Sequence, residues 1–343
     1  MSIKQKNGHG IIVKVLVIIA ALALLCFTAV SIYRFAVGKQ GGNATNPSEQ
    51  DSGKIIPVIS GSESFSADGV HYVRKRGVEA YLIMGIDRTT EQIAKRGTGG
   101  QADVLLLMVL DSETDSYQIL QINRDTMTQI TVLSKDGEIA GERFSPICLA
   151  HSFGSGGEDS CENTVRALSY LFSDIAIDGY FAINLDSLSI INAAVGGVTV
   201  KIDKDMTAAD PSFVSGTTVT LDETNIEAYV RARMKVGEDD NLNRMSRQKQ
   251  YMTQWLAKAK ERAQSNPSFL MDLVEDIADY SVTNMTEKKL ASVMNNAYKY
   301  TNKGMLSLEG EYMMGSVYNE FYADIESLQQ TIISLFYQEQ TVD

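Results

Sequence analysis

The chain carries EAYLIMGI at residues 79–86, VLLLMVL at residues 104–110 and SYQILQI at residues 116–122. The first two runs are almost wholly apolar and the third alternates apolar with polar side chains, and each pattern favours a β-strand. A polar loop of hairpin length, residues 111–115, joins the second run to the third, and a Gly-rich loop, residues 89–102, joins the first to the second. We therefore expect these three strands to form a meander.

The sequence that follows alternates between strand and helix patterns. Strands are predicted at residues 180–184 and 197–202, and helices at residues 162–172, 244–262 and near 268–279, 285–300 and 324–337. Thr220 and Glu223 have the spacing of a capping box, which predicts a helix from there to about Val230. Strands that alternate with helices indicate the α/β class. For residues 76–343 we expect a single three-layer domain with a central mixed sheet covered by helices.

An uncharged run of nineteen residues, Val15–Tyr33, precedes this domain and is long enough to cross the hydrocarbon core of a bilayer as a helix. More basic side chains lie before the run than after it, so the positive-inside rule favours a cytoplasmic N-terminus. A cleaved signal peptide is the alternative. It is disfavoured because the apolar run is long and the small-residue site Ala29-Val30-Ser31 is followed at once by bulky residues.

These features predict how the chain is arranged at a cell membrane. We expect a cytoplasmic tail at residues 1–14, a single transmembrane helix at 15–37 and a flexible extracellular linker, rich in Gly, Ser, Asn and Gln, at 38–75. The predicted location is therefore the cell membrane, with residues 76–343 outside the cell.

Charge and cysteine content narrow the classes of function. The first 37 residues hold four basic side chains and no acidic ones, which leaves 27 basic and 43 acidic side chains in the remainder, a net charge of −16. A surface this negative repels phosphate backbones, so nucleic acid is excluded as a partner. Cys148 and Cys161 lie in the part of the chain predicted to be outside the cell, a compartment that permits a disulfide between them. Two free thiols are the alternative.

The meander places three charged side chains at one edge of the predicted sheet. Asp87 follows the first strand, Asp103 precedes the second and Arg124 follows the third. Two carboxylates beside an arginine suit a divalent cation that bridges to phosphate oxygens. Alternatively, Asp87 is an ordinary turn residue and Asp103 an ordinary residue at the start of a strand, and the spacing does not exclude this interpretation.

A second group of arginines lies further along the chain. Arg231 and Arg233 are two residues apart and share one face of an extended segment. Arg244, Arg247, Gln248 and Tyr251 share one face of a helix. In so acidic a chain we interpret this group as an anion pocket, with surface ion pairs to the acidic residues 238–240 as the alternative.

The motifs together resemble the LytR–CpsA–Psr family over about residues 78–262, and we expect the resemblance to continue to the C-terminus. The resemblance is carried by the order of six short segments in the sequence: residues 85–88 (GIDR), 101–103 (QAD), 122–126 (INRDT), 194–200 (AVGGVTV), 231–233 (RAR) and 243–248 (NRMSRQ). It implies a phosphotransferase that moves a phosphoglycan (teichoic acid, capsule or a related wall glycopolymer) from a polyprenyl-pyrophosphate carrier to peptidoglycan.

The resemblance also implies roles for individual residues. Asp87 and Asp103 match acidic positions associated with Mg²⁺, for which Mn²⁺ is an alternative. Asp103 is favoured as the base for the acceptor hydroxyl. The pyrophosphate-binding positions are matched by Arg124, Arg231 and Arg233, and a polar helix face near the head group by Arg244 and Gln248. Asp103, Asp87 and Arg124 are thus the predicted catalytic residues.

Four positions depart from the family pattern and leave other functions open. Gln101 stands where arginine is frequent and Asn241 where aspartate is frequent, while Cys148 and His151 stand where Asn and Tyr are common. A polyprenyl-pyrophosphate phosphatase, in which water replaces the acceptor, is one alternative. A non-catalytic wall-binding or regulatory membrane protein is the other.

Overall fold

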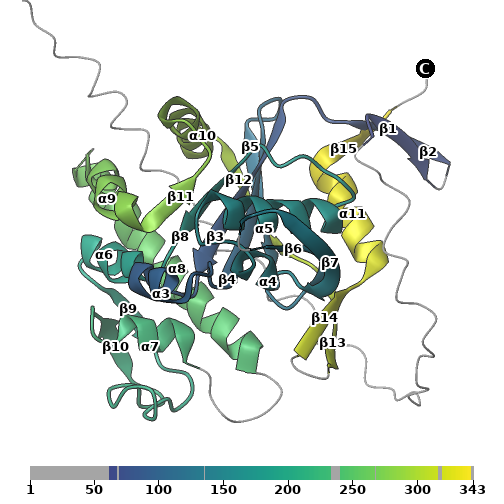
Figure 1. The fold of residues 1–343 in the computed structure, drawn as a ribbon. Helices are drawn as coiled ribbons and strands as arrows, with labels where there is room; N and C mark the ends of the chain where they lie inside the picture. Colours follow the sequence, from purple (N-terminus) through teal and green to yellow (C-terminus); the bar gives the residue numbers. More distant parts are fainter. Residues whose placement is uncertain are drawn as a thin grey trace, which may run out of the picture.

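The computed structural model describes residues 62–67, 69–134, 136–232, 240–266, 268–315 and 319–340. Its centre is a six-stranded sheet in the order β11-β8-β3-β4-β5-β12 (Figure 1). The strands are β3 (Val78–Ile86), β4 (Ala102–Asp111), β5 (Ser116–Ile122), β8 (Gly179–Ile183), β11 (Ser281–Thr283) and β12 (Thr301–Ser307). The predicted meander is confirmed, because β3 pairs antiparallel with β4 and β4 with β5. β8 and β12 join as parallel neighbours of β3 and β5, so the sheet is mixed.

Helices cover both faces of this sheet because successive side chains of each strand point to opposite sides. Ile83, Leu106 and Ile119 belong to one core cluster. The same cluster contains residues of α6 (Asp186–Ala194), α7 (Ile226–Arg231), α8 (Asp240–Ser265), α9 (Phe269–Ile277) and α10 (Glu287–Lys299). At its centre the fully buried Trp255 of α8 donates from Nε1 to the Ile191 carbonyl of α6 at 2.6 Å.

The opposite face has its own core. Leu82, Leu107 and Leu120 are fully buried against α4 (Leu149–Ser152), α5 (Glu158–Leu171) and α11 (Ile325–Phe336). Each fully buried side chain of this size stabilises the fold by about 1.5–3 kcal/mol. The predicted arrangement of a mixed sheet between two helical layers is therefore observed in the described residues.

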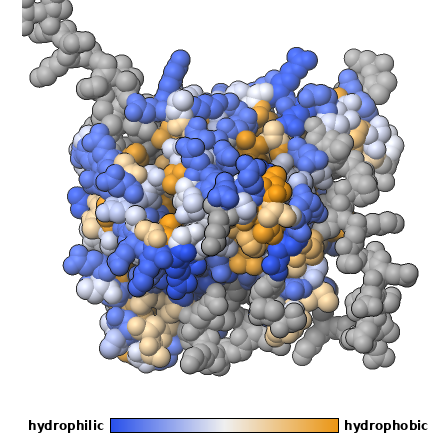
Figure 2. All heavy atoms as spheres, viewed as in Figure 1, coloured by the Kyte–Doolittle hydropathy of each residue, from blue (hydrophilic) through white to orange (hydrophobic). Residues whose placement is uncertain are grey.

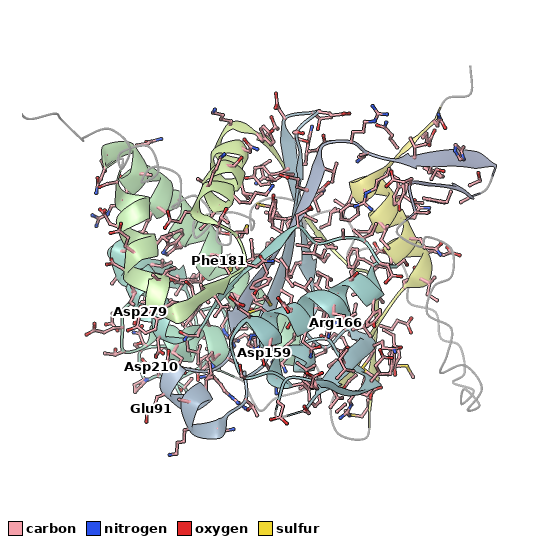
Figure 3. The ribbon with its side chains drawn as sticks, turned by 45° about the horizontal axis from the view of Figure 1, so that its top comes forward. Glu91, Asp159, Arg166, Phe181, Asp210 and Asp279 are labelled. Carbon is pink, nitrogen blue, oxygen red and sulfur yellow. The ribbon has the colours of Figure 1, made fainter. Side chains whose placement is uncertain are left out.

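The remaining elements are short and surround the three layers. They are α3 (Thr90–Arg96), the 3₁₀ turn η1 (Ala278–Tyr280), the hairpins β6 (Met127–Leu133) with β7 (Ile139–Pro146), β9 (Val198–Lys201) with β10 (Thr218–Leu221), and β13 (Gly310–Met314) with β14 (Asn319–Ala323), and the small sheet β1 (Ser64–Ala67), β2 (Val70–Arg74) and β15 (Tyr337–Glu339). Charged side chains such as Glu91 and Asp279 project from the periphery (Figure 3). The face seen in Figure 2 is mostly hydrophilic, with hydrophobic groups in small patches.

Two local expectations were wrong. Thr220 does not cap a helix, because it lies in β10 opposite Thr199 of β9, and α7 begins only at Ile226. The loop predicted at residues 89–102 contains α3, which Thr89 and Gln92 start with a true capping box. Residues 89–92 and 220–223 both have the capping-box pattern Thr-x-x-Gln/Glu. The second does not start a helix because Thr220 pairs with β9 as part of β10.

The N-terminal predictions lie outside the described residues. These are the cytoplasmic tail, the transmembrane helix at residues 15–37 and most of the linker at 38–75. Within the part of the chain that the structure describes, no helix combines the length and the apolar character needed to cross a membrane.

Candidate active site

The sheet brings Asp87, Asp103 and Arg124 to one edge. Asp87 follows the last residue of β3, and Arg124 lies two residues beyond β5. Asp103 occupies a break in the β3–β4 ladder, where Gly85 pairs with Val104 and Ile86 with Ala102, so Asp103 has no partner across the ladder. A bulge of this kind turns a side chain away from the regular alternation of the strand.

Backbone groups hold the Asp87 carboxylate in place. Its Oδ1 accepts a hydrogen bond of 2.7 Å from the Gln101 backbone N–H. This contact requires glycine at position 100, because Gly100 has φ +78° and an added Cβ would lie 2.9 Å from Asp87 Oδ1. Asp87 Oδ2 has no hydrogen-bond partner among the described residues. One carboxylate oxygen is thus fixed and the other is available to a ligand.

Asp103 binds two arginines from distant parts of the chain. Arg124 donates from Nη1 to Oδ1 in a short ion pair, and Arg244 of α8 donates from Nη1 to Oδ2 at 3.3 Å. Arg124 also donates from Nε to Asp125 at 3.2 Å. The side chains of Arg124 and Arg244 are only 10% and 6% exposed, so their charges act with little screening by water.

Gln101, which stands where the family often has arginine, contacts the same cluster. Its Oε1 accepts a hydrogen bond from Arg124 Nη2 and lies 3.8 Å from the Cys148 thiol. Gln101 therefore orients Arg124 through a neutral contact, where an arginine would add a further positive charge. Burial raises the pKa of Cys148 to about 12, so its sulfur is a protonated thiol at neutral pH.

The disulfide alternative for Cys148 and Cys161 is wrong in this structure, because both residues are buried free thiols. Their sulfurs have different neighbours: Cys148 faces Gln101, and Cys161 Sγ lies 3.9 Å from His151 Nε2. His151 is 1% exposed, and its Nδ1 lies 3.2 Å from the Gly100 carbonyl. A carbonyl only accepts, so Nδ1 carries the proton and His151 supports the backbone turn that holds Asp87.

Arg231 ends α7 beside this cluster. Its Nη2 donates to the Asp87 backbone carbonyl at 3.3 Å, and its Nη1 forms an ion pair with Glu227 one turn earlier. The side chain is 40% exposed, so the guanidinium remains accessible to a ligand. Arg233, its predicted companion, lies outside the described residues.

The side chains of the predicted polar face of α8 contact two different parts of the protein. Arg244 reaches Asp103, whereas Arg247 donates to the carbonyls of Tyr229 and Ala232 at the end of α7. Gln248 donates from Nε2 to the Val230 carbonyl at 3.2 Å. Basic and amide donors that bind the last carbonyls of a helix stabilise its C-terminus. Arg247 and Gln248 thus position the end of α7, and with it Arg231.

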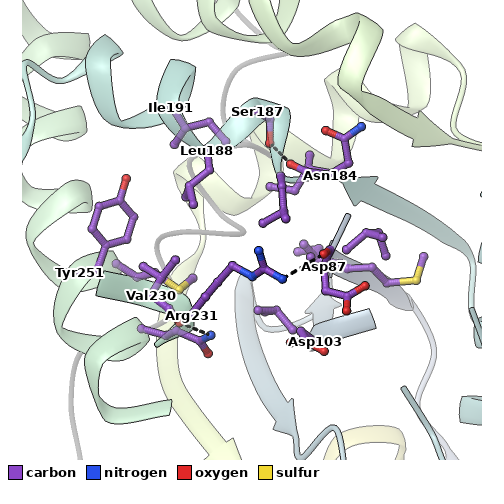
Figure 4. A pocket seen from close by; sticks show the side chains of 18 of the residues that line it. Asp87, Asp103, Asn184, Ser187, Leu188, Ile191, Val230, Arg231 and Tyr251 are labelled. Carbon is purple, nitrogen blue, oxygen red and sulfur yellow. Dashed lines mark hydrogen bonds between the residues drawn. The ribbon is translucent and has the colours of Figure 1, made fainter. Parts of the chain in front are cut away.

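An apolar cavity of about 140 Å³ opens onto the charged cluster. Its walls come from β3, β4, β8, α6, α7 and α8, and include Leu106, Ile183, Leu188, Ile191, Val230 and Met252. Asp87, Asp103, Arg231 and Gln248 line it as well (Figure 4). In Figure 4 the Arg231 guanidinium points toward Asp87, and Leu188, Ile191 and Tyr251 lie farther from Asp87. The sequence did not identify these wall residues, because an apolar side chain that lines a cavity has the same pattern as one in a packed core.

The carboxylates meet the minimum requirement for a cation shared with a ligand. Among the described residues, no three His, Cys, Asp or Glu side chains gather into a metal-binding group. Mg²⁺ often uses only one or two carboxylates together with substrate phosphates and water. Asp87 Oδ2 and the neighbouring Asp103 fit that pattern, and they do not fit a cage made of protein ligands alone.

An α/β protein with arginines and carboxylates at the mouth of an apolar cavity can bind an amphiphile with a phosphorylated head. The sequence profile of the LytR_cpsA_psr family matches residues 36–335. This match spans most of the 343 residues, so the chain belongs to the LytR–CpsA–Psr family.

Relatives with named activities are identical to this chain at about a quarter of the aligned positions. A polyisoprenyl-teichoic acid–peptidoglycan teichoic acid transferase TagU from Bacillus mycoides (strain KBAB4) is 28% identical over 250 residues, which cover 68% of this chain and 74% of that protein. The protein of the same name from Bacillus subtilis (strain 168) is 28% identical over 178 residues, 52% of this chain and 51% of its own length. This chain thus spans only about half the length of some of the relatives it matches.

Solved structures share the fold. Protein gbs0355 from Streptococcus agalactiae has a TM-score of 0.59 at 20% identity, covering 75% of this chain and 87% of its own. Bacillus subtilis TagV has a TM-score of 0.53 at 22% identity, with coverages of 76% and 96%. A structure of TagT bound to LI-WTA has a TM-score of 0.53 at 20% identity, with coverages of 76% and 90%. At these identities the likeness establishes the fold.

Proposed function

We propose that this protein transfers a phosphoglycan, such as a teichoic acid, from a polyprenyl-pyrophosphate carrier to peptidoglycan. The observation that carries the proposal is the apolar cavity that ends at Asp87, Asp103 and Arg231. An apolar cavity with charged groups at one end suits a ligand with a hydrocarbon tail and a phosphorylated head. The names of the TagU relatives support the same reaction.

The donor lies with its polyprenyl chain in the cavity and its pyrophosphate among the arginines. Arg231 lines the cavity mouth, and Arg124 and Arg244 flank Asp103 just beside it. A guanidinium presents two parallel N–H donors to a phosphate, so the three arginines both bind and orient the head group. Gln248, fixed on the Val230 carbonyl, lines the cavity at the same level.

Transfer exchanges one phosphorus–oxygen bond for another. The acceptor hydroxyl oxygen bonds to the phosphorus that carries the glycan, the bond to the lipid-side bridging oxygen breaks, and polyprenyl phosphate leaves. Negative charge spreads over the phosphoryl oxygens in the transition state, and the fixed arginines stabilise it. When Arg124 and Arg244 bind the phosphates, the Asp103 carboxylate, which both contact in this structure, takes the proton of the acceptor hydroxyl.

A divalent cation, Mg²⁺ or Mn²⁺, completes the proposed site. Asp87, with Oδ2 unengaged among the described residues, would hold it together with Asp103. Bound there, the cation neutralises phosphate charge that the two carboxylates would otherwise repel. We further propose that residues 15–37 anchor the protein in the cell membrane, with the site outside the cell, where both the lipid carrier and peptidoglycan are present.

The test is transfer of a radiolabelled glycan from a synthetic lipid-linked donor, with and without peptidoglycan. We expect labelled peptidoglycan only when both substrates and a divalent cation are present. Release of free phosphoglycan at the same rate without peptidoglycan would identify a pyrophosphatase. No consumption of donor by a folded protein that still binds peptidoglycan would identify a non-catalytic wall-binding protein.

A further inference from the structure

A second cavity lies between residues 201–206, α7 and α8, and the proposed reaction does not use it. Its volume is about 230 Å³. Asn243, Ser246, Arg247 and Gln250 of α8 line it, whereas Gln248, Tyr251 and Met252 line the apolar cavity. At 100° per residue Asn243, Ser246 and Gln250 point away from Gln248 and Met252, whereas Arg247 and Tyr251 are neighbours at the boundary between the two sets. The helix therefore separates an apolar cavity from a polar one, which we call the polar cavity.

The amide side chains of the polar cavity offer hydrogen-bond donors. Gln250 Oε1 accepts from the Lys201 backbone N–H at 3.0 Å and from the Tyr229 hydroxyl at 2.8 Å. Asn243 Oδ1 accepts from Lys204 Nζ at 3.0 Å. A backbone N–H and an ammonium group only donate, so both amides have a fixed orientation. Their oxygens are used by the protein, and their NH₂ groups have no partner among the described residues.

The charges in the polar cavity add to this preference for an acceptor ligand. The cavity is lined by three basic side chains, those of Lys201, Lys204 and Arg247, and by one carboxylate, that of Asp203. Within the described residues neither Lys201 nor Lys204 forms an ion pair, and the chain as a whole has a net charge of −12. A local surplus of positive charge in so acidic a protein favours an anionic ligand. Asp203 supplies an acceptor for a hydroxyl group on the same ligand.

We propose that the polar cavity binds a phosphate together with the adjoining hydroxyls of a polyol-phosphate chain. The proposal rests on the proposed function, because such a chain is the class of glycopolymer that the donor would carry. Arg244, which contacts Asp103, and Arg247, which lines the polar cavity, are three residues apart on α8, or about 4.5 Å along its axis. A polymer that extends from the reacting phosphate therefore passes close to this second site.

The test measures binding without any lipid-linked donor, so its outcome is independent of whether transfer occurs. The full-length chain in detergent is titrated calorimetrically with short glycerol-phosphate oligomers, inorganic phosphate and an uncharged glycerol oligomer. The variant is Lys201→Gln with Lys204→Gln. The matched control is Lys288→Gln with Lys303→Gln, which removes the same charge from exposed positions outside the polar cavity.

We expect the glycerol-phosphate oligomer to bind more tightly than inorganic phosphate, and the uncharged oligomer not to bind. The double variant should weaken oligomer binding about tenfold, a factor of about three for each exposed charge, while the control stays within twofold of the natural chain. Equal weakening in the two variants would show that only net charge matters and would overturn the site. Equal affinity for inorganic phosphate and the oligomer would overturn the assignment to a polymer.

Discussion

Replacing Arg124 with lysine tests the central arrangement of the site. Arg124 makes hydrogen bonds to Asp103, Gln101 and Asp125 from three different nitrogens. Lysine keeps the positive charge, but a single ammonium cannot reproduce this planar fork. Loss of two charge-assisted bonds, at about 1.5 kcal/mol each, amounts to about 3 kcal/mol. In the proposed transition state the same guanidinium binds phosphate oxygens, so the loss of two such bonds lowers turnover about 100-fold.

The assay is turnover of the lipid-linked donor at saturating peptidoglycan, beside thermal unfolding followed by circular dichroism. The matched control is Arg166→Lys on α5 (labelled in Figure 3), where the guanidinium donates to Asn163 at 3.4 Å. Each 1 kcal/mol of lost stability lowers the unfolding midpoint by about 2–4 °C in a domain of this size. Turnover within threefold of the natural chain in a folded Arg124→Lys protein would refute the reasoning. So would a loss of turnover that merely follows the loss of folded protein.

Three further predictions address the cation, the cavity and the buried histidine. Asp87→Asn, which removes the charge but keeps the acceptor for Gln101, should abolish the stimulation of transfer by Mg²⁺, and unchanged cation dependence would count against the metal assignment. Leu188→Trp should fill the apolar cavity, so that lipid extracted from the purified protein and quantified by mass falls well below that of the natural chain; equal lipid content would place the tail elsewhere. Burial lowers the pKa of His151 below the ordinary 6.5, so the unfolded chain binds more protons and stability should fall as pH decreases below about 6.5. Denaturant unfolding of His151→Gln should show a shallower loss between pH 7.5 and pH 5, and identical pH dependence in both proteins would contradict it.

The sequence alone determined the elements near the site and the order of the charged motifs. The runs at residues 79–86, 104–110 and 116–122 predicted strands that the structure confirms with small shifts at their ends. This was possible because an apolar run or a period of two is a local property, and the hairpin-length loop at residues 111–115 leaves antiparallel pairing as the simplest arrangement of the second and third runs. The same reasoning placed Asp87, Asp103 and Arg124 at one edge, where the structure brings them together.

Only the tertiary structure decided what these side chains bind. Asp103 and Arg244 are 141 residues apart, and no local pattern indicates that they form an ion pair. The bulge that re-aims Asp103 depends on the register between β3 and β4, which is set by packing on both faces of the sheet. The two cavities on opposite sides of α8 arise because side chains from several separate elements fail to fill the space between them. That is a property of the assembled layers, which a linear pattern of apolar and polar residues does not contain.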